Sequence, residues 1–119
     1  MTQPTLTARS DCIAACQACA AACDQCFAGC LKEDDVAMLA SCIALDTDCA
    51  ATCRLAEALM QRDSAVSGPV CASCAEVCDR CADECAKHEH DHCQLCAQAC
   101  RACAESCRAM ASLAPVVDA

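Results

Sequence analysis

The sequence predicts an all-α protein, an antiparallel up-down-up-down four-helix bundle with a cysteine-lined core. Its 119 residues include 19 cysteines, most of them spaced alternately three and four positions apart, which is the repeat of one helix face. The chain also has 28 alanines but only two glycines and three prolines, which favours long helices and few loops. Short polar segments divide the cysteines into four blocks, and short connections make neighbouring helices antiparallel.

The first helix is predicted near residues 8–31. Its cysteines alternate in spacing without interruption, so they form one stripe along the helix. The polar segment at residues 32–35 ends this helix, and Asp34 is a suitable N-cap for the next one. The stripe consists of Cys12, Cys16, Cys19, Cys23, Cys26 and Cys30.

The second helix, predicted near residues 35–62, carries fewer cysteines but keeps the same period. Its stripe contains Cys42, Cys49 and Cys53, and the remaining positions fall on Met38 or Leu39, Asp46, Ala56 and Met60. Asp46 is the one acid on a stripe, and we expect it to be a hydrogen-bonded or partly solvated acid rather than a metal ligand.

The last two helices are predicted near residues 70–88 and 92–112. Pro69 suits a first helical turn, and Asp91 followed by Gln94 has the form of a capping box. We expect one domain, residues 1–119, with short disordered termini. The two stripes consist of Cys71, Cys74, Cys78, Cys81 and Cys85, and of Cys93, Cys96, Cys100, Cys103 and Cys107.

Composition limits the possible functions. The formal net charge of −9 disfavours nucleic acid or an anionic membrane as partner, and no continuous apolar stretch approaches the length of a bilayer-spanning helix. The first ten residues lack the apolar run of a secretory signal, which predicts a cytoplasmic protein. Without a catalytic triad, phosphate-binding loop or paired-carboxylate motif, the chain is not expected to be an enzyme.

The spacing of the cysteines indicates the metal. Residues four apart on a helix have Cβ atoms about 5–6 Å apart, so their sulfurs can approach to about twice a metal–thiolate bond of about 2.3 Å. One Cu(I) ion can bridge such a pair, whereas structural zinc requires four ligands. The pairs are Cys12/Cys16, Cys19/Cys23, Cys26/Cys30, Cys49/Cys53, Cys74/Cys78, Cys81/Cys85, Cys96/Cys100 and Cys103/Cys107.

Charge supports the same metal, because a buried thiolate is costly unless a cation neutralises it. One monovalent ion per thiolate leaves a neutral interior. We therefore expect multiple Cu(I) ions per chain, of the order of one per cysteine.

The repeated Cys-x-x-x-Cys segments, such as Cys12-Ile-Ala-Ala-Cys16 and Cys96-Ala-Gln-Ala-Cys100, resemble the bacterial Csp copper storage proteins. The likeness extends over about residues 10–112. It implies a bundle that stores many Cu(I) ions, with all 19 cysteines as core ligands. It further implies a homotetramer and, because no export signal is visible, the cytosolic branch of the family.

The ends of the bundle carry the remaining candidate ligands. His88 and Met38 continue two stripes at one end, where imidazole and thioether suit uptake and transfer of copper, and the Csp resemblance implies the same. His90 and His92 are expected to be turn residues. At the other end, Met60 and Met110 are either a second entrance or a hydrophobic plug. Copper donor or acceptor proteins are possible partners.

Two alternative functions stay open from the sequence. The chain could sequester zinc or cadmium like a helical metallothionein, or carry electrons through iron-sulfur clusters or dithiols. Disulfides between neighbours on one helix would close very short loops and contribute little stability. If the bundle forms before metal binds, the metal-free protein should already be helical.

Overall fold

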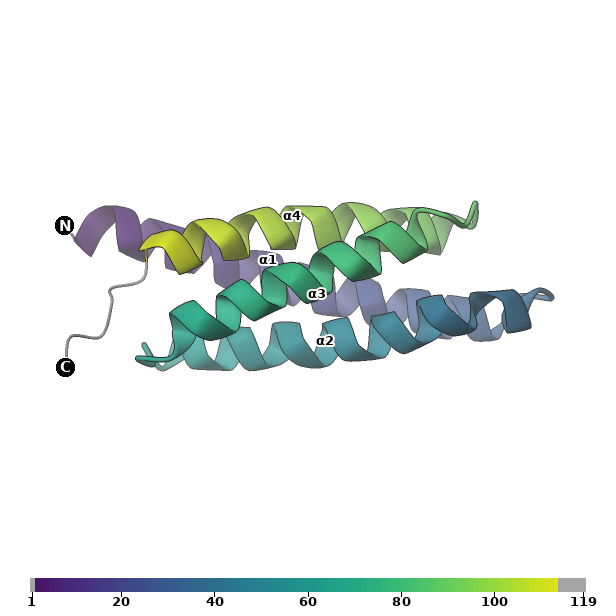
Figure 1. Ribbon diagram of the computed structural model, residues 1–119, viewed down its shortest axis with the longest axis horizontal. Helices are drawn as coiled ribbons and strands as arrows, with labels where there is room; N and C mark the ends of the chain where they lie inside the picture. Colours follow the sequence, from purple (N-terminus) through teal and green to yellow (C-terminus); the bar gives the residue numbers. More distant parts are fainter. Residues whose placement is uncertain (1, 114–119) are drawn as a thin grey trace.

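The computed structural model describes residues 2–113, and side chains from Leu6 onward. Its elements are α1 (Thr2–Leu31), the short 3-10 helix η1 (Val36–Leu39), α2 (Ala40–Gln61), α3 (Ser67–Cys85) and α4 (Asp91–Leu113). Figure 1 shows the four α-helices running alternately up and down along one elongated bundle. No strand occurs within residues 2–113.

Each α-helix packs against two others. α1 contacts α2 and α4, and α3 contacts the same two helices, whereas the diagonal pairs α1 with α3 and α2 with α4 are not in close backbone contact. The four helices therefore surround one shared interior (Figure 1). This confirms the predicted antiparallel four-helix bundle with a cysteine-lined core.

The helix limits differ from the predicted ones mainly at the turns. α1 begins at Thr2 instead of near residue 8, and Pro4 lies in its first turn, where proline is tolerated because that N–H has no partner in the helix. The segment predicted as one helix over 35–62 is divided into η1 and α2. Disorder is also predicted at the carboxyl terminus, and residues 114–119 lie outside the described part of the chain.

The predicted caps are wrong. Asp35 rather than Asp34 precedes η1, and it makes no side-chain cap hydrogen bond. Gln94 does not complete a capping box, because its Nε2 donates to the carbonyl oxygens of Ala86 at 3.2 Å and His88 at 2.6 Å. The last carbonyls of a helix lack partners within it, so Gln94 joins the start of α4 to the end of α3.

Small side chains fill the core. Apart from cysteine and alanine, its buried apolar residues within the described side chains are Leu39, Met60 and Met110. Small residues let the helices approach closely, while ion pairs such as Arg101–Asp83 at 3.4 Å join neighbouring helices at the exposed surface. The buried alanines are Ala20, Ala50, Ala56, Ala75, Ala82, Ala97 and Ala104.

One segment among the described residues, Val36–Gln61, is long and apolar enough by composition to cross a membrane. The sequence-based expectation concerns a continuous apolar stretch, whereas this segment is apolar on average and is interrupted by charged residues such as Asp46 and Arg54. Core helices of bundles meet the same criterion, since cysteine and alanine count as apolar. The buried face of this segment carries the cysteines of α2 and Asp46.

Candidate metal centre

All 19 cysteines face the interior. Each is a free thiol, and each side chain is 0% exposed. The helical period explains this arrangement, because side chains spaced alternately three and four residues apart share one face, and all four helices turn that face inward. The sulfur atoms therefore form a column along the bundle.

The sulfurs approach one another across helices as well as along them. Cys19 Sγ lies 3.7 Å from Cys49 Sγ of α2 and 3.6 Å from Cys100 Sγ of α4. The shortest contact, 3.2 Å, joins Cys42 Sγ of α2 to Cys85 Sγ of α3. Such contacts between helices exist because the four stripes meet on one axis, and they are not visible in the spacing of any single helix.

Contacts along one helix are also present. Sulfur atoms four residues apart lie within 4.0 Å of each other in the pairs Cys26/Cys30, Cys74/Cys78, Cys81/Cys85, Cys96/Cys100 and Cys103/Cys107. These distances are shorter than two metal–thiolate bonds of about 2.3 Å in a line. Bent two-coordinate or bridged three-coordinate ions therefore fit without movement of the backbone.

The thiols form overlapping sets of four whose sulfurs all lie within 4.8 Å of one another. Cys100, for example, belongs to one set with Cys19, Cys23 and Cys49 and to another with Cys23, Cys81 and Cys96. A single set could also surround a tetrahedral divalent ion. Shared members favour ions linked by bridging thiolates, and they make the column one continuous network.

Burial determines the protonation of the thiols at one end of the column. Desolvation raises the pKa of Cys30 to about 11, and the pKa of Cys93 is raised for the same reason. Both side chains are therefore thiols at neutral pH. A metal that binds them must displace protons, so the affinity of this end increases with pH.

Asp46 lies inside the column and is fully buried. Its Oδ1 accepts hydrogen bonds from Cys81 Sγ at 3.5 Å, Cys85 Sγ at 3.5 Å and Cys96 Sγ at 3.3 Å. Burial raises the pKa of this carboxyl to about 8, so the acid is mostly neutral at pH 7. The sequence predicts that Asp46 is either a hydrogen-bonded or a partly solvated acid, and in the structure it is hydrogen-bonded.

His92 is the histidine that reaches the sulfurs. Its Nδ1 lies 3.5 Å from Cys93 Sγ and 3.9 Å from Cys30 Sγ, and its Nε2 lies 2.8 Å from Glu33 Oε2. The ring packs directly over Gly29, where a Cβ atom would stand 2.6 Å from His92 Cδ2. The prediction that His92 is a turn residue is wrong, because His92 lies in the first turn of α4, four residues before Cys96 and therefore close to the sulfur-bearing face.

Among the described residues, the hydrogen bonds to cysteine sulfurs include none from His88, and Met38 is mostly exposed. His88 Nε2 is 3.0 Å from Glu84 Oε2, an interaction that lowers the pKa of Glu84. Met38 is 75% exposed, whereas the adjacent Leu39 is 0% exposed, so Leu39 takes the interior position at this end of the second stripe. His90 pairs with Asp35, which raises the pKa of His90.

Comparison with known protein families shows which family the chain belongs to. The model of the Csp copper storage proteins matches residues 6–112. This chain belongs to the copper storage protein family. The resemblance predicted from the Cys-x-x-x-Cys repeats is therefore confirmed, and so is the prediction of copper storage. No curated protein sequence matches the chain closely enough to count as a relative.

Solved structures agree with the family. The Cu(I)-bound copper storage protein BsCsp3 is 50% identical, with a TM-score of 0.84 over 87% of this chain and 98% of that one. Metal-free copper storage protein 3 from Bacillus subtilis is 50% identical, with a TM-score of 0.81 over 86% and 97%. A cytosolic copper storage protein from Streptomyces lividans, with five coppers, is 40% identical, with a TM-score of 0.88 over 91% and 95%.

Proposed function

We propose that this Csp protein stores Cu(I) inside the bundle, with the thiolates of its 19 cysteines as ligands. The continuous sulfur network carries this proposal. It extends from Cys30 and Cys93 beside His92 to Cys12 and Cys107, whose sulfurs lie 3.6 Å apart. Because most of the thiols contact two or more others, such as Cys100 with Cys19, Cys23, Cys49 and Cys96, their thiolates can bridge more than one ion.

The charge of the interior supports a monovalent ion. Each thiol that binds a metal loses a proton, and a buried thiolate needs a compensating positive charge. One Cu(I) per thiolate leaves the column neutral, so we expect of the order of one ion per cysteine. The Streptomyces lividans protein Ccsp, 41% identical, has been solved loaded with 10 copper equivalents, which supports a capacity well above that of a single cluster.

The end that carries His92 is the proposed mouth of the store. An arriving ion would meet His92 Nδ1 together with the thiols of Cys30 and Cys93, because this is where an imidazole borders the sulfur column. In this proposal Met38 and His88 contact copper only before it reaches the column. The exposed thioether of Met38 suits contact with a copper donor or acceptor protein.

Anaerobic titration of the fully reduced protein with Cu(I), followed by a competing chelator, tests the storage function. We expect saturation of the order of one ion per cysteine and slow loss to the chelator. Saturation at about four ions, as tetrahedral four-thiolate sites would give, would favour the zinc or cadmium alternative. Displacement of the bound copper by equimolar zinc would contradict copper storage.

The setting of the protein is a separate proposal. We infer a cytoplasmic, non-enzymatic protein, since the matched Streptomyces lividans protein is described as cytosolic and the family is one of storage proteins. A homotetramer is expected from the resemblance to the Csp family. Light scattering after size-exclusion chromatography measures the mass of the assembly, and a monomer at micromolar concentration would contradict this expectation.

A further inference from the structure

The end of the bundle opposite His92 contains a sulfur pair that includes a methionine. Cys71 of α3 has no cysteine four residues away in either direction, and its Sγ lies 3.7 Å from Met60 Sδ at the end of α2. Met60 is 1% exposed, so this thioether is part of the core. The sulfur column thus continues past its last thiols into a thioether.

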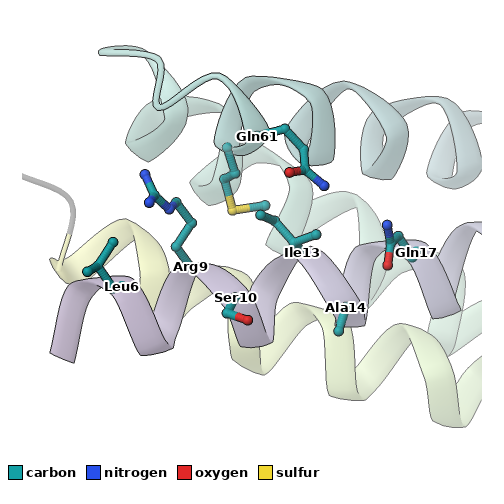
Figure 2. A pocket seen from close by; sticks show the side chains of 8 residues that line it. Leu6, Arg9, Ser10, Ile13, Ala14, Gln17 and Gln61 are labelled. Carbon is teal, nitrogen blue, oxygen red and sulfur yellow. The ribbon is translucent and has the colours of Figure 1, made fainter. Parts of the chain in front are cut away.

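Met60 also borders the outside of the bundle. It lines a surface pocket of about 490 Å³ between α1 and the end of α2. Figure 2 shows Arg9, Ser10 and Ile13 of α1 and Gln61 of α2 around this pocket. Arg9 is paired with Asp63 at 2.8 Å, so its charge is balanced. Met60 therefore separates a solvent-accessible pocket from the Cys71 thiol.

A third observation concerns Ser67. This residue lies one helical turn before Cys71 on the same face of α3, is 5% exposed, and its Oγ has no hydrogen-bond partner among the described residues. An unpaired buried hydroxyl is unfavourable. A thiolate at Cys71, one helical turn away, would be a stronger acceptor for this hydroxyl than either a neutral thiol or a methionine thioether, which are both weak acceptors.

We propose that Met60 and Cys71 form a thioether–thiolate Cu(I) site that ends the column and is reached through this pocket, as a second port. Thioether and thiolate are both soft ligands that Cu(I) accepts at low coordination number. Met60 Sδ already lies 3.7 Å from Cys71 Sγ, and the flexible unbranched side chain of methionine lets both sulfurs adjust to one ion while Met60 still borders the pocket. On binding, the Cys71 S–H bond breaks, an S–Cu bond forms, the proton goes to water in the pocket, and copper stays Cu(I).

This inference rests on the proposed storage of copper, and a selenium probe tests it separately. The protein is produced with selenomethionine, loaded anaerobically with Cu(I), and studied by X-ray absorption at the selenium edge. We expect copper at bonding distance from selenium, a signal that is lost in Met60→Leu and retained in Met110→Leu and Met38→Leu. Met110 is the matched control because it is also buried at this end of the bundle.

The outcomes separate the two proposals. A selenium–copper signal that is absent from the wild-type protein, or that persists in Met60→Leu, overturns the Met60 site even when the total copper capacity is high. A low copper capacity in the wild-type protein overturns storage itself, whatever the selenium signal.

A second experiment tests the port. Ser10→Trp fills the pocket from its α1 wall, and Ser73→Trp places the same side chain at an exposed position of α3 that does not line it. With total capacity unchanged in both, we expect slower transfer of copper to a chelator only in Ser10→Trp, because one of two routes is closed. Equal rates in the two variants would make this end a plug.

Discussion

Replacing Asp46 with asparagine should make the stability of the metal-free protein depend less on pH. Asp46 is fully buried, and desolvation raises the pKa of its carboxyl from 3.8 to about 8. Between these two values the unfolded chain has lost this proton while the folded protein keeps it. Each pH unit upward within this window therefore costs the folded protein about 1.4 kcal/mol.

Asparagine has nearly the shape of aspartic acid but does not ionise. From about pH 5 to about pH 7, the free energy of unfolding of Asp46→Asn should therefore rise relative to that of the wild-type protein by about 2.7 kcal/mol. Both pH values lie inside the window, so the result requires only that the pKa of the folded protein exceeds the higher value. Equilibrium denaturation by guanidinium, followed by circular dichroism on fully reduced metal-free protein, measures this difference.

A matched control is available on the same helix. Asp48 is exposed, so Asp48→Asn should show no comparable change relative to the wild-type protein between the two pH values. The reasoning is refuted if the difference between Asp46→Asn and the wild-type protein stays constant with pH, or if the wild-type protein gains stability relative to the variant as the pH rises.

Three further predictions concern the mouth, the core and the surface. Gly29→Ala places a Cβ atom 2.6 Å from His92 Cδ2, so the first Cu(I) equivalents should load more slowly in stopped-flow measurements while the total capacity is kept; an unchanged rate would contradict the mouth. Ala82→Leu overfills a position that is 0% exposed and should lower the free energy of unfolding by about 1–3 kcal/mol. Arg54→Ala removes an exposed ion pair with Asp24 and should change it by less than about 1 kcal/mol. Chemical denaturation of the metal-free protein checks the last two, and a large loss in Arg54→Ala would mean that surface ion pairs hold the bundle together.

Cysteine spacing is enough to predict the bundle because the period of an α-helix determines which residues share a face. The same spacing assigns Cys19, Cys49 and Cys100 to the interior faces of three different helices. It does not predict that their sulfurs lie 3.6–3.9 Å apart, since periodicity within one helix contains no information about the rotation and axial shift of its neighbour.

The mouth is harder to predict for local reasons. The sequence allows either Met38 or Leu39 at the interior position, and the 3-10 turn of η1 turns Leu39 inward. His92 stands in a short polar segment rich in histidine, which favours a turn. Its position depends on the absence of a side chain at Gly29 and on the carboxylate of Glu33, two residues that lie far from it in the sequence.

The close-packed alanine walls of the bundle have a consequence for the timing of copper release. An ion in the middle of the column would be shielded from solvent at the sides of the bundle, since among the described side chains every cysteine is 0% exposed and alanines such as Ala50 and Ala104 are buried between the sulfur stripes. It can leave only after ions nearer an end have moved. The residence time of a copper ion would thus depend on its position along the column as well as on the affinity of its site.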